Sequence, residues 1–375
     1  MQFPNEVQSA LLFDGPVAAL DDIVRAFMRV EEARSGARFS VPEAKPGTFY
    51  RLFGGGDEMM VTLEYVDGPA NAEVFAQALG SAVTGILCPD IRERLMRSRS
   101  HILVNVSHGA MGNVLSSPDI ARFLQQIDYK AEGQTLRQFV RRLDLCALIS
   151  RIVCDHAPAR VVHWCQSNQL FAGEKFDVVA SLPAPGPLHV HPFLFGGAKA
   201  EGGETKLGIR TFGARHFVGR EVLIEPSVLP WAANFETICA FLKIATVDKG
   251  YVIPDGDTFG PEDRSQSYRV VYREAEEGDV PLFELQPLMY REFNFQADDY
   301  VPRDKVFNDQ APPSAIMPPD AEEKMELVNE WREKRKLAEG LGGTFEVRAR
   351  GLGSNGGGAP PAGPGGRPVF GRKRA

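Results

Sequence analysis

Two histidines separated by a single residue are the first position in this sequence where metal chemistry could occur. His189 and His191 lie in a largely apolar segment, residues 188–195, that predicts a strand. Because alternate residues of a strand share a face, both imidazoles would lie on one side. A metal site needs at least a third protein ligand, and His216 with Glu221 supplies only a loose version of one. We therefore expect strand histidines without a metal, and a metal site is the alternative.

A thiol and an imidazole lie close together in a second segment. His163 and Cys165 share one face of a predicted strand over residues 160–165. Two residues of strand span about 7 Å, and a nucleophile and its base are recognised by geometry rather than by closeness in sequence. We expect this pair to be structural rather than catalytic.

A polar cluster lies within residues 208–258, and its densest part is at 208–225. On a predicted strand over residues 221–225, Glu221 and Glu225 share a face, and arginines lie nearby in the sequence. Two interpretations stay open: an ion-paired sheet edge, which contributes little to stability, or a polar surface that recognises a ligand. The residues of this candidate recognition surface are Arg210, Arg215, Glu221, Glu225, Asp255 and Asp257.

Motifs for cofactors are not found. Residues 255–258 (Asp-Gly-Asp-Thr) resemble part of a calcium loop, but the remaining ligands and the terminal Glu of such a loop are missing. They predict a tight turn instead. The glycines at 54–56 lack the Lys and Ser/Thr of a phosphate-binding loop and predict a hairpin. We expect no cofactor.

Two segments of this region resemble a known family. Residues 212–225, then a predicted helix, then residues 250–260 are similar to the bacterial family called domain of unknown function 4261. In that family a Gly-x-x-x-Phe/Leu-Gly-x-x-Glu-Val/Leu-x-Ile segment precedes a helix and a Gly-Asp-Thr-Ile/Phe-Gly loop. The resemblance is specific over residues 204–290 and implies no activity. It implies fixed positions for Gly213, Glu221, Gly256, Asp257 and Thr258.

Composition limits the classes of function. With 42 basic and 49 acidic residues the net charge is -7, which argues against nucleic-acid binding through the folded body. The apolar windows are short and interrupted by charge, and the N-terminus has no signal-peptide pattern, so we expect neither a membrane span nor secretion. The five cysteines show no CxxC spacing, which is typical of buried thiols in a reducing compartment. We expect a cytoplasmic protein.

The periodicity of apolar residues predicts the elements that position these groups. The first lobe is expected to run strand, helix, strand, strand, helix, strand, which is the ferredoxin-like succession. The second is expected to begin with the strand at 160–165 and a helix at 167–180. The predicted fold is α+β: two ferredoxin-like α/β sandwich lobes with mostly antiparallel sheets, a C-terminal helix and a disordered tail.

Shifts in composition predict the domain boundaries. We expect a ferredoxin-like lobe at 1–115, connecting helices at 116–157, and a C-terminal α+β lobe carrying the family-like segment at 158–300. A linker with a charged helix follows at 301–340. Residues 341–375 are rich in Gly and Pro and locally basic, and such a segment is too poor in apolar residues to offset the entropy of ordering.

The end of the tail combines one aromatic anchor with three cations, an arrangement suited to a short binding motif. The residues of this candidate motif are Phe370, Arg372, Lys373 and Arg374. The leading hypothesis is a non-enzymatic protein-binding or adaptor module with a protein partner. The alternative is a hydrolase or metal-dependent enzyme that uses the polar cluster at 208–258 or the pair His189 and His191.

Overall fold

The computed structural model divides the chain into two units, residues 2–191 and residues 192–375. The structure describes residues 3–4, 6–17, 20–54, 59–108, 135–199, 205–248, 252–261, 263, 265–275, 279–300 and 368–370. The α+β class with two mostly antiparallel sheets is confirmed. The boundary between the units lies after His191 rather than at the expected residue 158, because two further strands pair into the first sheet.

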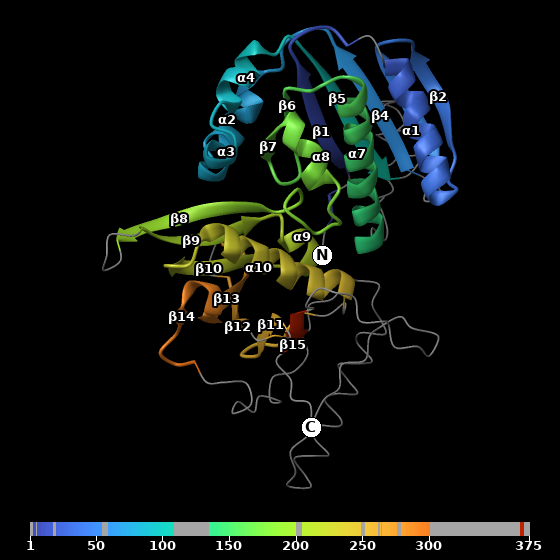
Figure 1. Ribbon diagram of the computed structural model, residues 1–375. Helices are drawn as coiled ribbons and strands as arrows, with labels where there is room; N and C mark the ends of the chain where they lie inside the picture. The colour runs from blue at the N-terminus through green and yellow to red at the C-terminus, as the bar shows by residue number, and fades with distance from the viewer. Residues whose placement is uncertain are drawn as a thin grey trace. The chain divides into compact units, whose positions relative to one another are not determined.

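The N-terminal unit is built on a seven-stranded sheet with the order β2-β3-β4-β5-β1-β6-β7 (Figure 1). Every registered pair in it is antiparallel. Its strands are β1 (Glu6–Phe13), β2 (Phe39–Lys45), β3 (Phe49–Gly54), β4 (Met59–Val66), β5 (Ser100–His108), β6 (Val161–Trp164) and β7 (Gln169–Ala172). The first part of the chain has one strand more than the expected ferredoxin-like succession, because β2 lies between α1 and β3. β1 also pairs with β6 as well as β5, so the sheet is larger than the expected lobe.

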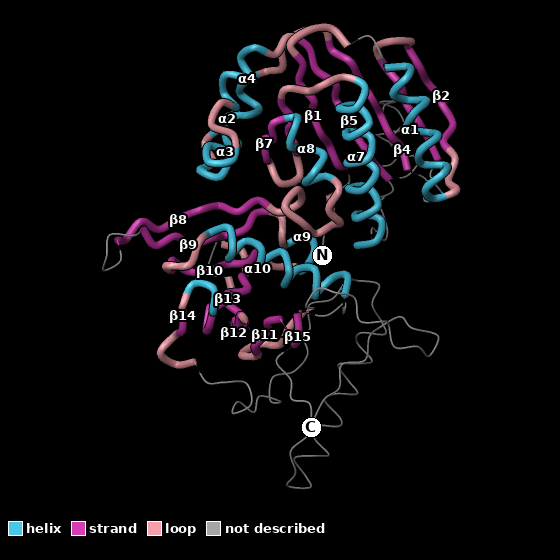
Figure 2. The backbone as a smooth tube through the Cα atoms, in the orientation of Figure 1, coloured by secondary structure: helices cyan, strands magenta, loops and turns pink. Residues whose placement is uncertain are grey.

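Helices cover both faces of this sheet, as Figure 2 shows. One face carries α1 (Leu20–Ser35), α7 (Leu136–His156) and α8 (Gly173–Ala180). The other carries η1 (Ala72–Phe75), α2 (Ala76–Leu79), α3 (Ala82–Leu87) and α4 (Ile91–Arg97). Successive side chains of each strand point to opposite faces and so contribute to two cores. In β1, Ser9 forms a hydrogen bond with Ser150 of α7, whereas the neighbouring Ala10 packs with Phe75 and Ile91.

Residues 167–180 differ from the expected single helix. Gln169–Ala172 form β7, all four residues are buried, and they pair with β6 across a turn in which Asn168 has a positive φ of 49°. Tertiary pairing overrides the local helical pattern here. The helix α8 starts only at Gly173, where a Cβ would lie 1.7 Å from the carbonyl oxygen of Ala159.

The C-terminal unit contains an eight-stranded sheet with the order β15-β11-β12-β13-β10-β9-β8, and β14 pairs with β13. Its strands are β8 (His191–Lys199), β9 (Thr205–Phe212), β10 (Glu221–Ser227), β11 (Thr258–Pro261), β12 (Gln266–Arg273), β13 (Leu282–Tyr290), β14 (Phe295–Gln296) and β15 (Pro368–Phe370). Strands β10 and β13 are parallel, and the other registered pairs are antiparallel.

A long helix packs on this second sheet. It is α10 (Trp231–Lys243), which continues into the π-helical turn η2 (Ile244–Asp248). Phe241 of α10 stacks against Phe259 and Phe283, with ring centroids 5.7 and 5.5 Å away. Two short helical turns, α9 (Arg215–Val218) and η3 (Arg291–Phe293), connect strands.

Several predictions fall on residues that the structure does not describe. They are the connecting segment 116–134, the charged helix within 301–340, most of the tail, and the cations Arg372, Lys373 and Arg374. Within the described part of the chain, no helix has the length and apolar character needed to cross a membrane.

Candidate functional site

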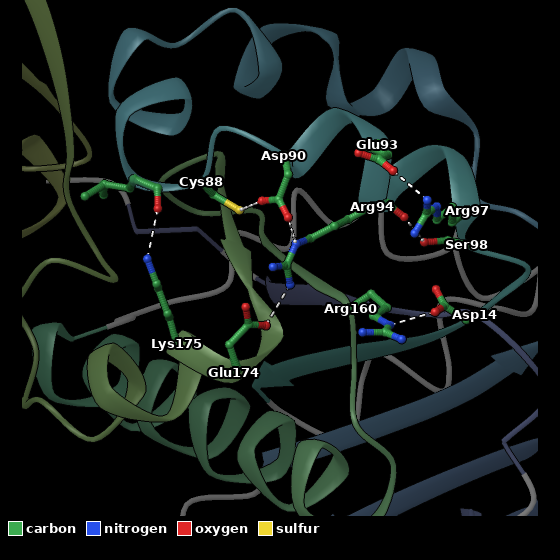
Figure 3. Close-up of polar contacts among 11 residues, drawn as sticks. Asp14, Cys88, Asp90, Glu93, Arg94, Arg97, Ser98, Arg160, Glu174 and Lys175 are labelled. Carbon is green, nitrogen blue, oxygen red and sulfur yellow. Dashed lines mark hydrogen bonds and ion pairs between the residues drawn. The ribbon is translucent and has the colours of Figure 1, made fainter.

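The N-terminal unit contains a cleft of about 610 Å³ at one end of its sheet, where β1 and β7 end and β6 begins. Four charged side chains line it: Asp14, Arg94, Arg160 and Glu174. Figure 3 shows them as two pairs: Arg94 of α4 with Glu174 in the first turn of α8, and Arg160 before β6 with Asp14 after β1. The volume is within the range of about 300–1,000 Å³ typical of ligand sites.

Backbone hydrogen bonds hold these segments together. The N–H of Arg160 donates to the carbonyl of Leu12 (2.8 Å), and that of Gly173 donates to the carbonyl of Arg160 (3.1 Å). Gly173 is required because its backbone passes so close to Ala159. The cleft is therefore a consequence of strand pairing, and its walls are fixed by main-chain contacts.

Arg94 connects the helices on opposite faces of the sheet. Its Nε donates to Oδ2 of Asp90, the residue before α4, and its Nη1 donates to Oε2 of Glu174 in α8, both at 2.8 Å (Figure 3). The guanidinium lowers the pKa of both carboxyls. The carboxylates are thus held ionised at neutral pH, so neither is suited to act as a general acid.

Arg160 and Asp14 form the second ion pair of the cleft, with Nε 2.6 Å from Oδ2. Both side chains are about half exposed. Within the described part of the chain, the terminal guanidinium nitrogens of Arg160 make no hydrogen bond. They present donors that can bind an acceptor oxygen on a ligand.

The thiols at this cleft are not activated. Cys154 lines the cleft, and burial raises the pKa of its thiol to about 12. Cys88, which precedes α4 in the chain, donates to Oδ1 of Asp90 (3.3 Å), and burial raises the pKa of its thiol to about 11. A thiol needs a lowered pKa or a neighbouring base to act as a nucleophile at neutral pH. The arrangement is suited to recognition of charge rather than to covalent chemistry.

His189 and His191, the pair for which a metal site was the alternative, are both buried. Strand β8 begins at His191, so His189 lies in the preceding turn, where its Nδ1 accepts from the N–H of Gly186 (3.3 Å). Nε2 of His191 lies 2.9 Å from the hydroxyl of Ser81. Burial lowers the pKa of His189 to about 3 and that of His191 to about 4. Among the residues that the structure describes, no group of three or more His, Cys, Asp or Glu is arranged to hold a metal.

His163 and Cys165 are closer than the sequence suggested, because a third residue orients them. Nδ1 of His163 lies 3.6 Å from Sγ of Cys165, and its Nε2 lies 2.9 Å from Oδ1 of Asn168. Asn168 donates to Gln77 through Nδ2, so its Oδ1 faces His163 as an acceptor. This places the imidazole proton on Nε2 and leaves Nδ1 to accept from the thiol. Burial raises the pKa of Cys165 to about 11 and lowers that of His163, which opposes a thiolate–imidazolium pair.

Glu221, a member of the candidate recognition surface, is a buried structural residue. Its carboxylate accepts hydrogen bonds from the hydroxyl of Thr211 (2.7 Å) and from the N–H groups of Gly213 (3.0 Å) and Ala214 (3.1 Å). Burial raises its pKa. These contacts close the turn between β9 and α9, so the side chain is not available to a ligand.

The other members of that surface are dispersed among separate partners. Arg210 pairs with Asp279, and Glu225 pairs with Arg273 at 3.2 Å. Asp255 accepts from the N–H of Tyr272 (2.8 Å).

The remaining two members of the candidate recognition surface are Arg215 and Asp257. Nε of Arg215 lies 4.0 Å from Oε1 of Glu221, the one close approach among the six residues in the described structure. Asp257 is buried and accepts from the N–H of Thr258 (2.8 Å), as the predicted tight turn requires. The six residues do not form a single site.

Sequence reasoning did not find the cleft. Asp14, Arg94, Arg160 and Glu174 come from four separate segments of the sequence. The available signal was a set of charged residues at strand ends and helix starts, which is common in any α+β protein. The end of the sheet at which they meet depends on the order of the strands.

Comparisons with family models, curated proteins and solved structures found no match for this chain.

Proposed function

We propose that this protein is a non-enzymatic binding module, and that the cleft of its N-terminal unit receives charged side chains of a partner protein. The observation that supports this most is the pair of solvent-accessible ion pairs, Arg94 with Glu174 and Arg160 with Asp14, on the walls of one cleft. Positively and negatively charged side chains therefore line the same cavity. A partner segment carrying both an acidic and a basic side chain matches this pattern.

The contrast with an enzyme supports the same role. Ion pairing with Arg94 lowers the pKa of Glu174, and burial raises the pKa of the Cys154 thiol to about 12. General acid–base catalysis instead needs groups that titrate near the working pH. The hydrolase alternative has less support, because its candidate groups at 208–258 are dispersed and His189 and His191 are buried.

Two further expectations are part of the proposal. The five cysteines are free thiols in the structure, which supports a reducing compartment such as the cytoplasm. The likeness of residues 204–290 to the family called domain of unknown function 4261 is supported by the residues at 212–225 and 250–260.

The experiment is affinity capture with the full-length chain and two matched variants. The test variant is Arg94→Met with Arg160→Met, which removes both cations of the cleft and keeps much of the aliphatic bulk. The control is Arg97→Met on the same helix, an exposed arginine that pairs with Glu93 outside the cleft lining. We expect a reproducible set of partner proteins to be retained by the wild type and the control and lost by the double variant. Retention by all three would remove the cleft from the function.

A further inference from the structure

A second groove lies in the C-terminal unit, between helix α10 and the edge strand β11. Its volume is about 200 Å³, and α10 supplies Ala233, Glu236, Thr237 and Ala240 to its lining. The β11 side of the groove is lined by Phe259, Gly260 and Pro261. A groove bounded by an edge strand on one side and a helix on the other is a geometry in which extended peptides add to a sheet.

The strand β11 has an edge available for such an addition. On one side it pairs antiparallel with β12, through Thr258 with Arg269 and Phe259 with Tyr268. Gly260 cannot carry a side chain, because a Cβ there would lie 2.1 Å from the carbonyl oxygen of Gln266. Pro261 lacks an N–H, and proline is tolerated at sheet edges for that reason. The edge therefore accepts only a short partner strand.

The chain itself supplies that partner strand. Pro368–Phe370 form β15, which pairs antiparallel with β11: Phe259 faces Phe370, Gly260 faces Val369 and Pro261 faces Pro368. The three β11 residues in this register are the same three that line the groove. An edge strand with unpaired N–H and C=O groups tends to recruit another strand, and here a segment about a hundred residues later in the chain fills the position.

Charge supports the same occupant. An antiparallel strand that continued this register would pass Thr258 and reach the level of Asp257 and Asp255, of which Asp255 is exposed. Glu236 is exposed at the groove. In the sequence, Phe370 is followed after one glycine by Arg372, Lys373 and Arg374. The sequence after the paired segment is thus basic, and Glu236 supplies a carboxylate at the groove.

We propose that the groove between α10 and β11 is part of a peptide-binding site and that the chain's own segment Pro368–Phe370 pairs with the β11 edge of this site within the same molecule. The class of ligand is an extended peptide with a proline, an apolar residue and an aromatic residue followed by cations. The tethered segment competes with any partner peptide of this chemistry, so binding requires its release. This site is separate from the cleft of the N-terminal unit.

The test uses a fluorescein-labelled peptide of residues 365–375 and three full-length variants. The first variant carries Val369→Gly and Phe370→Gly, which weakens the internal competitor. Glu236→Lys, added to it, reverses a charge at the groove, and Asp298→Lys, added instead, is a matched reversal at an exposed residue outside the groove lining. Fluorescence anisotropy measures affinity, and hydrogen exchange follows the amides of β11.

We expect the tail variant to bind the peptide at least tenfold more tightly than the wild type, and its β11 amides to exchange faster in the absence of peptide. Glu236→Lys should weaken the binding severalfold, and Asp298→Lys should leave it unchanged. Equal affinity for the wild type and the tail variant, or no binding to either, would overturn the proposal. A wild-type dimer that the tail variant abolishes would place the segment on a second copy and overturn docking within one molecule.

Discussion

Nη1 of Arg94 lies 2.8 Å from Oε2 of Glu174, and this ion pair joins helix α4 on one face of the N-terminal sheet to α8 on the other. Its place at the mouth of the cleft gives one side chain two possible roles, holding the helices or contacting a ligand. The two roles have different consequences when Arg94 is replaced.

Arg94→Met should change thermal stability little. Glu174 is 57% exposed in this pair, and ion pairs that water reaches contribute little to stability. We expect the melting temperature to fall by less than about 3 °C, since a loss of 1 kcal/mol shifts a domain of this size by about 2–4 °C. Calorimetry on the wild type, Arg94→Met and Arg97→Met checks this. A fall several times larger for Arg94→Met alone would make the residue structural and weaken the binding proposal.

Glu221→Ala should destabilise the C-terminal unit strongly. The change leaves the hydroxyl of Thr211 and two backbone N–H groups without their acceptor in a buried turn. We expect a loss of about 2–4 kcal/mol in the free energy of unfolding. Glu225→Ala, on the same strand but exposed and paired with Arg273, is the control, with an expected loss of at most about 0.5 kcal/mol. Urea unfolding measures both losses. Equal small losses would show that Glu221 is not a structural residue and would make it a candidate for ligand recognition again.

The N-terminal unit should lose stability as the pH falls below 6.5. Burial lowers the pKa of His191 to about 4 and that of His189 to about 3. Between these values and 6.5 the unfolded chain binds protons that the folded chain does not. The free energy of unfolding therefore keeps its full histidine contribution above pH 6.5 and decreases as the pH falls below it. A fall in pKa from 6.5 to about 4 corresponds to about 3 kcal/mol.

The variant His191→Gln tests the cause of this pH dependence. Glutamine can still bond the hydroxyl of Ser81 but does not titrate. We expect its free energy of unfolding to fall less steeply between pH 6.5 and 4 than that of the wild type, measured by urea titration at each pH. Parallel slopes for the two proteins would contradict the assignment to His191.

Cys165 should react slowly with iodoacetamide at pH 7. The array of Cys165, His163 and Asn168 has the order of groups used by thiol hydrolases, but burial raises the pKa of the thiol to about 11. Relative to a free cysteine with a pKa near 8.5, the thiolate fraction is reduced by roughly 300-fold. Mass spectrometry of alkylated peptides measures the rate at each cysteine. Rapid and selective labelling of Cys165 that His163→Asn abolishes would favour an enzyme after all.

Protein purified without added metal should contain no stoichiometric metal ion. His189 and His191 lie in a turn and at a strand start, and the described residues bring no third ligand to them. Elemental analysis measures this directly. About one zinc, iron or manganese per chain, lost on replacement of His191, would contradict it.

Local pattern alone determined the α+β class and most of the strands and helices. The segments 160–165 and 221–225 predicted β6 and β10. These elements have an apolar face that is specified by adjacent residues, so no long-range information was needed to find them. The tight turn at Asp257 was predictable for the same reason, because its hydrogen bond goes to the next residue.

The strand order, the unit boundary and the cleft were decided only by the tertiary structure. β6 belongs to the first sheet because it pairs with β1 across some 150 residues of sequence, and β7 follows by pairing with β6. A pairing choice of that range leaves no local pattern. The same choice brings Asp14, Arg94, Arg160 and Glu174 to one end of the sheet. Sequence therefore determined which residues are charged or apolar and where the regular elements lie. Pairing between strands determined which charged side chains meet in a cleft. It also determined which of them, like Glu221, hydrogen-bond to the backbone of a buried turn.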